Sequence, residues 1–417
     1  MRYPTMSSTV QLILLLLVLI GVAKIGGALS AALGQPTVLG KLLAGVLLGP
    51  SLINVMHWET FQSSDLKSTI HYLSELGVIF LMFIAGLRIE AHELREAGKA
   101  ATWTAILGVI IPFFGGLLSA LAFGYGLIPA IFVGLLLTAT SVSISAQTLV
   151  ELGRLKSRVG TTLLGAAVLD DIIGLLLLSI FMATQTSDGN FMTIVWTIVR
   201  LVGFLVVAWF LGQRFLPRIL ERVKKMRTNE PVLTFAVLVV LGLAFTAETV
   251  GHLAAITGAF MAGILLSHTD VRDEIDRSIS SFTYAVLVPI FFIGIGLNTD
   301  LSSLSGAAIP MAIMLCIVAI GTKIVGCGLG AKIAGLNQRE AIQVGCGMIS
   351  RGEVGLIVAS LGVQNQIVDT NVFSLTVAVV LVTTLVTPIL LKWSFKTEPL
   401  PSLHLALEPE DEVLAIG

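Results

Sequence analysis

Two adjacent carboxylates, Asp170 and Asp171, lie near the middle of an apolar stretch that runs from Gly160 to Thr184. The stretch is long enough to cross a bilayer. A charged side chain at the centre of a membrane helix costs roughly 2.5–3.5 kcal/mol on insertion scales, so such residues usually serve a function. We therefore expect the two carboxylates to be the working groups of the protein, able to bind a cation or a proton.

A third charge, Lys323 in AIGTKIVGCGLG, is also expected at mid-membrane depth. A buried ammonium needs a partner, and the two aspartates are candidates. Adjacent residues on a helix point about 100° apart, so one aspartate can pair with Lys323 while the other faces a water-filled path. The two carboxylates would then differ in how readily they exchange a proton. The alternative is a static buried ion pair, which leaves the second aspartate unexplained.

Two further apolar stretches, 128–150 and 339–362, are unusually polar at mid-depth. The first contains LLTATSVSISAQTL and the second GCGMISRGEVG, with Arg351 and Glu353. Interrupted helices at matching positions in two halves of a chain point to a transport site. Glu353 could offset the positive ends of the half-helices, and Arg351 the negative ends. The alternative is ordinary packing of helices through small residues.

The composition indicates an all-α polytopic membrane protein. Of the 417 residues, 55% are hydrophobic and only 12% are charged, whereas soluble domains are about 25% charged. The continuous apolar segments exclude a transmembrane barrel. Three cysteines without metal-ligand spacing are expected to be buried thiols. We predict thirteen membrane spans, at 8–29, 36–54, 69–87, 101–124, 128–150, 160–184, 191–214, 232–250, 253–267, 283–298, 306–333, 339–362 and 371–394.

Lysine and arginine concentrate in the connections after the odd-numbered spans and in the tail. By the positive-inside rule, the N-terminus is outside and the C-terminus is cytoplasmic. The apolar run 10–23 is expected to be a retained first helix rather than a cleaved signal peptide. No soluble domain is expected after the last span.

The two halves of the sequence resemble each other. LGKLLAGVLLGPS matches ITGAFMAGILLSH, FLMFIAGLRIE matches IFFIGIGLNTD, and TLVELG matches LIVASLG. Each partner lies seven spans later, and because seven is odd, the second copy is inverted in the membrane. Inverted repeats of this kind are typical of transporters with a binding site near the midplane.

Taken in order, TATSVSISAQTL, AAVLDDIIGL, TKIVG and SRGEVGLIVA resemble the monovalent cation:proton antiporter-2 family, and most closely its bacterial sodium/proton antiporters with an Asp-Asp motif. The resemblance covers nearly all thirteen spans. It implies an inverted-repeat fold with two crossed discontinuous helices. It also implies that Asp171 is the ion and proton carrier, and that Asp170 is paired with Lys323.

The resemblance carries further roles. Thr140 and Ser141 match the unwound segment beside the ion, and Glu353 matches the acid that compensates the crossed helix ends. It implies a homodimer in a lipid bilayer, without a resident cofactor or nucleic acid. The expected parts are dimerisation segments 1–98 and 229–304, core segments 99–186 and 305–396, a linker helix within 187–228, and a cytoplasmic tail, 397–417.

The predicted activity is electrogenic exchange of Na⁺, or Li⁺, for H⁺ by alternating access, in a bacterial inner or plasma membrane. Potassium/proton exchange is the nearest alternative. A cation channel and a non-transporting sensor are more distant ones. An intramembrane aspartyl protease needs its aspartates on two separate helices, which the consecutive Asp170 and Asp171 do not provide.

Overall fold

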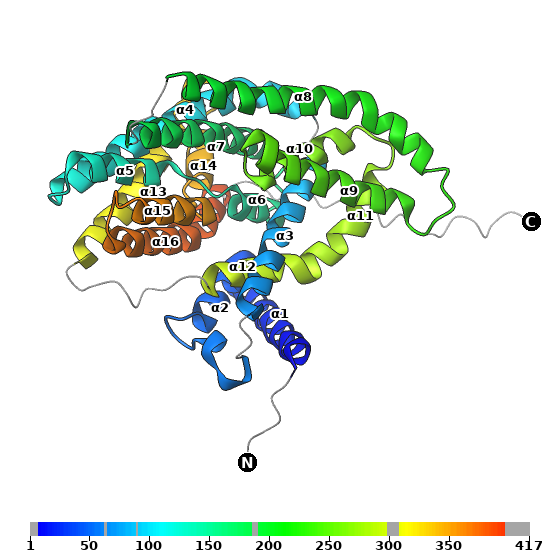
Figure 1. The fold of residues 1–417 in the computed structure, drawn as a ribbon, viewed down its shortest axis with the longest axis horizontal. Coiled ribbons are helices and arrows are strands. Elements are labelled where there is room, and N and C mark those ends of the chain that lie inside the picture. Colours follow the sequence, from blue (N-terminus) through cyan, green and yellow to red (C-terminus); the bar gives the residue numbers. More distant parts are fainter. Residues whose placement is uncertain (1–6, 62–64, 89–90, 186–190, 298–307, 397–417) are drawn as a thin grey trace, which may run out of the picture.

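The chain, described here from a computed structural model, is helical in every element assigned within residues 7–61, 65–88, 91–185, 191–297 and 308–396 (Figure 1). The elements are α1 (Ser8–Ala32), α2 (Thr37–Leu48), η1 (Val55–His57), η2 (Glu59–Phe61), α3 (Asp65–Arg88), α4 (Ala91–Ala122), α5 (Leu127–Thr138), α6 (Val142–Glu151), α7 (Arg158–Gln185), α8 (Phe191–Val223), α9 (Pro231–Thr246), η3 (Ala247–Gly251), α10 (Ala255–Ser267), α11 (Arg272–Phe282), η4 (Thr283–Leu287), α12 (Val288–Leu297), α13 (Ile309–Ile333), α14 (Gln338–Gly347), α15 (Glu353–Gln364) and α16 (Thr370–Phe395). The predicted tail, 397–417, lies outside the described residues.

Ten helical stretches of the described chain are long and apolar enough to cross a membrane. The other three predicted spans, 36–54, 253–267 and 339–362, contain shorter helices: α2, α10, and α14 with α15. The three cysteines are free and buried, as expected.

Several helices extend beyond the predicted apolar spans. The helix predicted for 191–214 continues to Val223, and the one predicted for 283–298 begins at Arg272 as α11, η4 and α12. The extension of α8 is amphipathic, with Leu220 buried and Arg222 exposed. Hydropathy therefore predicted the apolar part of each helix, but not the polar turns that continue it.

Figure 1 shows two groups of helices. In one, α4, α5 and α7 gather with α13–α16; in the other, α1–α3 gather with α9–α12; α8 runs along both. Within the groups, α13 packs on α4 and α10 packs on α3. In both contacts the backbones of the two helices lie close together. A Cβ at Gly326 of α13 would lie 2.5 Å from the Leu107 carbonyl oxygen, and one at Gly86 of α3 would lie 2.2 Å from that of Phe260.

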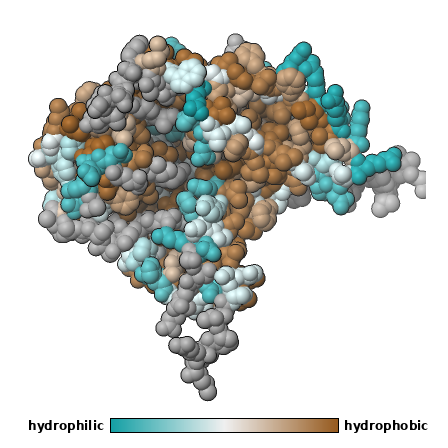
Figure 2. Space-filling view, viewed as in Figure 1, coloured by the Kyte–Doolittle hydropathy of each residue, from teal (hydrophilic) through white to brown (hydrophobic). Residues whose placement is uncertain are grey.

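The surface is apolar over much of the molecule. Figure 2 shows a broad hydrophobic face where α8, α9 and α10 lie. Many large apolar side chains on α1, α8 and α9 are exposed, among them Leu17, Phe210 and Leu238. A surface of this kind suits contact with lipid rather than water.

Candidate functional site

Two spans are broken by short extended segments at the centre of the first group of helices. In the first, α5 ends at Thr138 and α6 begins at Val142, with Ala139 and Ser141 both in non-helical conformations. In the second, α14 ends at Gly347 and α15 begins at Glu353. The serine, threonine and glycine content of both stretches permits these breaks, because such residues weaken the helix and can bond to freed backbone groups.

The two breaks are bonded to each other. The Ser141 amide donates to the Ser350 carbonyl at 2.8 Å, and the Ser350 hydroxyl donates to the Ser141 carbonyl at 2.5 Å. Ser145 adds a hydrogen bond to the Gly347 carbonyl. These side chains are buried. Each break therefore satisfies backbone groups that the other leaves without a helical partner.

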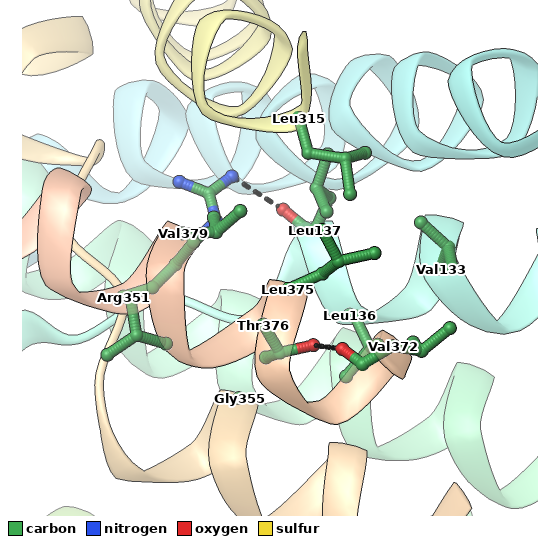
Figure 3. A pocket seen from close by; sticks show the side chains of 11 residues that line it. Val133, Leu136, Leu137, Leu315, Arg351, Gly355, Val372, Leu375, Thr376 and Val379 are labelled. Atoms are coloured by element: carbon green, nitrogen blue, oxygen red, sulfur yellow. Dashed lines mark hydrogen bonds between the residues drawn. The ribbon is translucent and has the colours of Figure 1, made fainter. Parts of the chain in front are cut away.

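Arg351 reaches from the second break to the end of α5. Its guanidinium donates to the Leu137 carbonyl at 2.8 Å (Figure 3). It also donates to the Ile349 carbonyl at 2.5 Å. Only 1% of the residue is exposed. The cation thus lies at the C-terminal, partially negative end of a half-helix, where positive charge is stabilised.

Asp170 on α7 and Lys323 on α13 form an ion pair beside the breaks. The lysine Nζ lies 3.3 Å from both carboxylate oxygens, and neither side chain is more than 2% exposed. Thr140 also interacts with the Asp170 carboxylate. Charge-assisted N–H···O bonds are usually 2.7–2.9 Å long, so this pair is loose. A Cβ at Gly108 of α4 would lie 2.5 Å from the Cys327 sulfur and 4.0 Å from the Lys323 Nζ, so α4 packs closely beside the lysine.

Asp171 lies between two cavities of different size. One has a volume of about 110 Å³; both aspartates, Thr138 and the exposed His252 line it. The other has a volume of about 10 Å³ and is lined by apolar side chains, among them Val168 and Phe260. The larger cavity has room for a cation with water, whereas the smaller one has room for about one water molecule.

The structure therefore gathers Asp170, Asp171, Thr140, Ser141, Lys323 and Arg351 around the two breaks. Glu353 is the first residue of α15, but its side chain lies outside the described part of the structure.

Sequence reasoning missed one residue here, His252, whereas Thr138 lies in the polar stretch LLTATSVSISAQTL that it singled out. His252 has a left-handed backbone (φ 53°) after the π-turn η3, and its turn carries it to the mouth of the cavity. Its position in a loop between two spans gave no sign of this contact.

Comparisons with known proteins agree on one family. The profile described as "Sodium/hydrogen exchanger, transmembrane" matches residues 14–397. The chain is 39% identical to the Na(+)/H(+)-K(+) antiporter GerN of Bacillus cereus, with 89% of this chain and 93% of GerN covered. It is 37% identical to a Na(+)/H(+) antiporter of Enterococcus hirae, covering 89% and 95%. It is 34% identical to the high-affinity Na(+)/H(+) antiporter NhaS3 of Synechocystis sp., covering 90% and 88%.

The fold has a solved counterpart. The sodium proton antiporter MjNhaP1 of Methanocaldococcus jannaschii superimposes with a TM-score of 0.68 over 93% of this chain and 97% of its own, at 17% identity. At that identity the likeness concerns the fold.

Proposed function

This chain belongs to the sodium/hydrogen exchanger family, whose members are antiporters rather than enzymes, and from that membership we propose that it exchanges Na⁺ for H⁺ across a membrane. The proposal also agrees with the earlier resemblance to the antiporter-2 family. The observation that carries it is the buried Asp170–Lys323 pair beside Asp171, at the point where two broken helices meet.

In this proposal, Asp171 and Asp170 bind the transported Na⁺ with oxygens of Thr140 and Ser141. Carboxylate, hydroxyl and carbonyl oxygens suit a hard monovalent cation. Sodium and protons compete for the same carboxylates, so each displaces the other, and leak is suppressed. Arg351 and Glu353 offset the partial charges of the helix ends that the ion approaches.

The Asp170–Lys323 pair makes the exchange electrogenic. When sodium binds, Asp171 loses its proton. If sodium also draws Asp170 away, Lys323 is left buried without its counter-charge, and a buried lysine readily loses its proton. Two protons then leave for each sodium ion. The 3.3 Å contacts of the pair favour such switching over a static role.

The two cavities support alternating access. The larger one lies toward the C-terminal half of α7, where Gly174 and Leu178 line it, and the smaller one toward its N-terminal half, where Leu164 and Val168 line it. With the orientation proposed from the positive-inside rule, the wider cavity faces the outside and the narrower one the cytoplasm.

We also propose the following organisation. The thirteen predicted spans cross the membrane, with α14 and α15 forming the twelfth, and the two halves are inverted repeats. Helices α1–α3 and α9–α12 form a dimerisation domain, α8 a linker, and α4–α7 with α13–α16 a moving core. The protein is a homodimer in a bacterial inner membrane, with its C-terminus in the cytoplasm and no resident cofactor.

The test uses purified protein in liposomes with an internal pH dye. Sodium, lithium and potassium are each scanned across pH, with the membrane potential clamped. Saturable proton movement on addition of sodium, at a rate that follows the potential, is the expected result. A rate that ignores the potential would refute the two-proton scheme, and single-channel currents would indicate a channel.

Potassium/proton exchange is the second candidate. The name of GerN includes K⁺ as well as Na⁺. A larger potassium response than sodium response in the same liposomes would favour it.

A further inference from the structure

Glu151, the last residue of α6, reaches across to the first turn of α2. Its carboxylate accepts a hydrogen bond of 2.6 Å from the Thr37 amide and another from the Thr37 hydroxyl. Gln147 donates to the same carboxylate at 3.1 Å, and the Lys41 ammonium lies 4.0 Å away. The carboxylate is only 16% exposed and the lysine 10%. We call these four residues the clasp.

The clasp joins α6, which packs on α16 and α7 of the first group of helices, to α2 of the second group (Figure 1). Helix α2 packs on α1 and α12, whereas α6 carries Ser141 of the first break at its other end. Thr37 is the first residue of α2 and has no side-chain cap of its own helix, since Pro36 precedes it. Glu151 therefore acts as the cap of α2 from another helix, where a negative charge is stabilised by free amides and the helix dipole.

The clasp also lies on the narrow side of the ion site, which the proposed alternating access takes as the closed side. From Glu151 the chain leads through a short connection to Arg158, the first residue of α7. The narrow cavity between that end of α7 and Asp171 has a volume of about 10 Å³, while the cavity on the opposite side has about 110 Å³. The hydrogen bonds thus hold α6 against α2 in the state in which the path on this side is shut.

We propose that Glu151 is a positioning residue that holds this closed side shut, and that the Glu151–Thr37 bonds break each time the site opens toward it. The inference rests on the proposed alternating access. It assigns to Glu151 a role in setting the relative populations of the two access states, and this role is separate from ion binding. Because two hydrogen bonds to a charged group are lost on opening, the clasp should shift the ratio of the two states by about a hundredfold or more.

The first test joins the two helices covalently. Thr37 and Glu151 are both changed to cysteine, and a short, reducible bis-methanethiosulfonate links them in purified protein in liposomes. The expected result is loss of at least nine-tenths of sodium-driven proton movement on linking, with recovery after reduction. The matched control changes Arg158 and Glu340, an ion pair of 3.6 Å between α7 and α14 within one group of helices; linking it should leave exchange unchanged.

Exchange by the wild-type chain reports the proposed function. The unlinked double-cysteine protein, in which Lys41 lacks the Glu151 counter-charge, sets the baseline, and only the further loss on linking reports the clasp, so the two can fail separately. The wild-type chain, whose three cysteines are buried, controls for the reagent. Full exchange by completely linked Thr37–Glu151 protein overturns the inference.

The second test removes the clasp without touching the buried charges. Glu151→Ala would leave Lys41 without its counter-charge, so Thr37 is the better target. Thr37→Pro removes both the amide and the hydroxyl donor, at a first-turn position that accepts proline; Thr37→Val removes only the hydroxyl. In everted vesicles, Thr37→Pro should lower the apparent KM for Na⁺ added on the clasp side by about tenfold or more, and Thr37→Val by less.

Thr102→Val, which removes a local hydroxyl bond on the exposed face of α4, is the control. If Thr37 had only a structural role, Thr37→Pro would lower the transport rate in proportion to the amount of folded protein and leave the KM for Na⁺ unchanged. That result would contradict the inference. Amide hydrogen exchange near Thr257, which lines the narrow cavity, should rise in Thr37→Pro and fall in the linked protein. This second readout does not depend on transport.

Discussion

Two ion pairs of this protein, one buried and one half-buried, each combine an aspartate with a cation, but they differ in the cation and in its contacts. Asp170 and Lys323 meet at 3.3 Å in the first group of helices. Arg88 and Asp276 meet in the second, where the guanidinium donates three bonds of 3.0–3.2 Å to the carboxylate. An arginine keeps its proton and fixes a carboxylate with a rigid fork, whereas a buried lysine can lose its proton. We therefore call the Arg88–Asp276 pair the clamp and, under the proposed mechanism, the Asp170–Lys323 pair the switch.

The surroundings reinforce the difference. Ser280 donates to Asp276 at 2.6 Å and accepts from Arg88, and Arg272 bonds to the Arg88 carbonyl, so α3 and α11 are held at several points. Around Asp170 the structure instead has a cavity and a threonine. Four substitutions test this contrast.

The largest effect is expected at Asp171, the carboxylate beside the Asp170–Lys323 pair. Asp171→Asn keeps the shape of the cavity but removes the carboxylate that we propose exchanges cation and proton, so sodium-driven proton movement in liposomes should be abolished. Size-exclusion elution of the purified variant checks that it is folded. Wild-type activity in this variant would remove Asp171 from its role as carrier.

Asp170→Asn should have the next largest effect. Lys323 then no longer gains and loses an Asp170 counter-charge during the transport cycle. The variant should therefore retain slower, electroneutral exchange. The measurement compares rates at clamped potentials of opposite sign. A residual rate that still follows the potential would show that the charge is carried by groups other than the Asp170–Lys323 pair.

At the clamp, Arg88→Lys should change stability and leave exchange per folded molecule unchanged. A lysine cannot reproduce the bidentate contact, so the free energy of unfolding should fall by about 1–2 kcal/mol. Thermal unfolding in detergent measures the stability loss. A large loss of transport with unchanged stability would place this pair among the switching groups.

The smallest effect is expected at an exposed pair beyond the membrane, Lys224 and Asp270. The hydrogen bond from Lys224 lowers the pKa of the Asp270 carboxyl below its ordinary 3.8. The pair therefore stabilises the fold above pH 3.8, and the contribution is lost as the pH falls through the lower folded pKa. Asp270→Asn should slightly lower the melting temperature at pH 7 and have less effect at pH 3.5, measured by thermal scans at both pH values.

The contrast also shows which parts of the site could be predicted from the sequence. Asp170, Asp171 and Lys323 stand out because charge is rare in apolar stretches, and the breaks were indicated by serine and glycine. The partners of Arg351 and Glu151 were not predictable, because a backbone carbonyl of Leu137 or an amide of Thr37 has no signature in the sequence. Arg88 and Asp276 were missed as a pair for a similar reason: each lies in a charged connection, where ions are ordinary.

The fold shows the same division. Hydropathy predicted the apolar spans, while the helical extension before 283 and the length of α8 depend on tertiary packing of amphipathic turns. Local pattern indicates what enters the membrane, and only the assembled structure shows where a helix ends.

The Asp170–Lys323 pair also sets a problem for biogenesis, since its two members are separated by 153 residues. At ribosomal rates of ~5–20 residues per second, the lysine follows the aspartate by roughly 8–30 s. The two breaks, which are joined by Ser141 and Ser350, are 209 residues apart. The time between the synthesis of the first break and that of the second is therefore longer. The nascent protein thus carries its carboxylates and open backbone groups into the membrane well before their partners exist. Until the second half is made, the first half must be stabilised by the insertion machinery, or its carboxyls must stay protonated and uncharged.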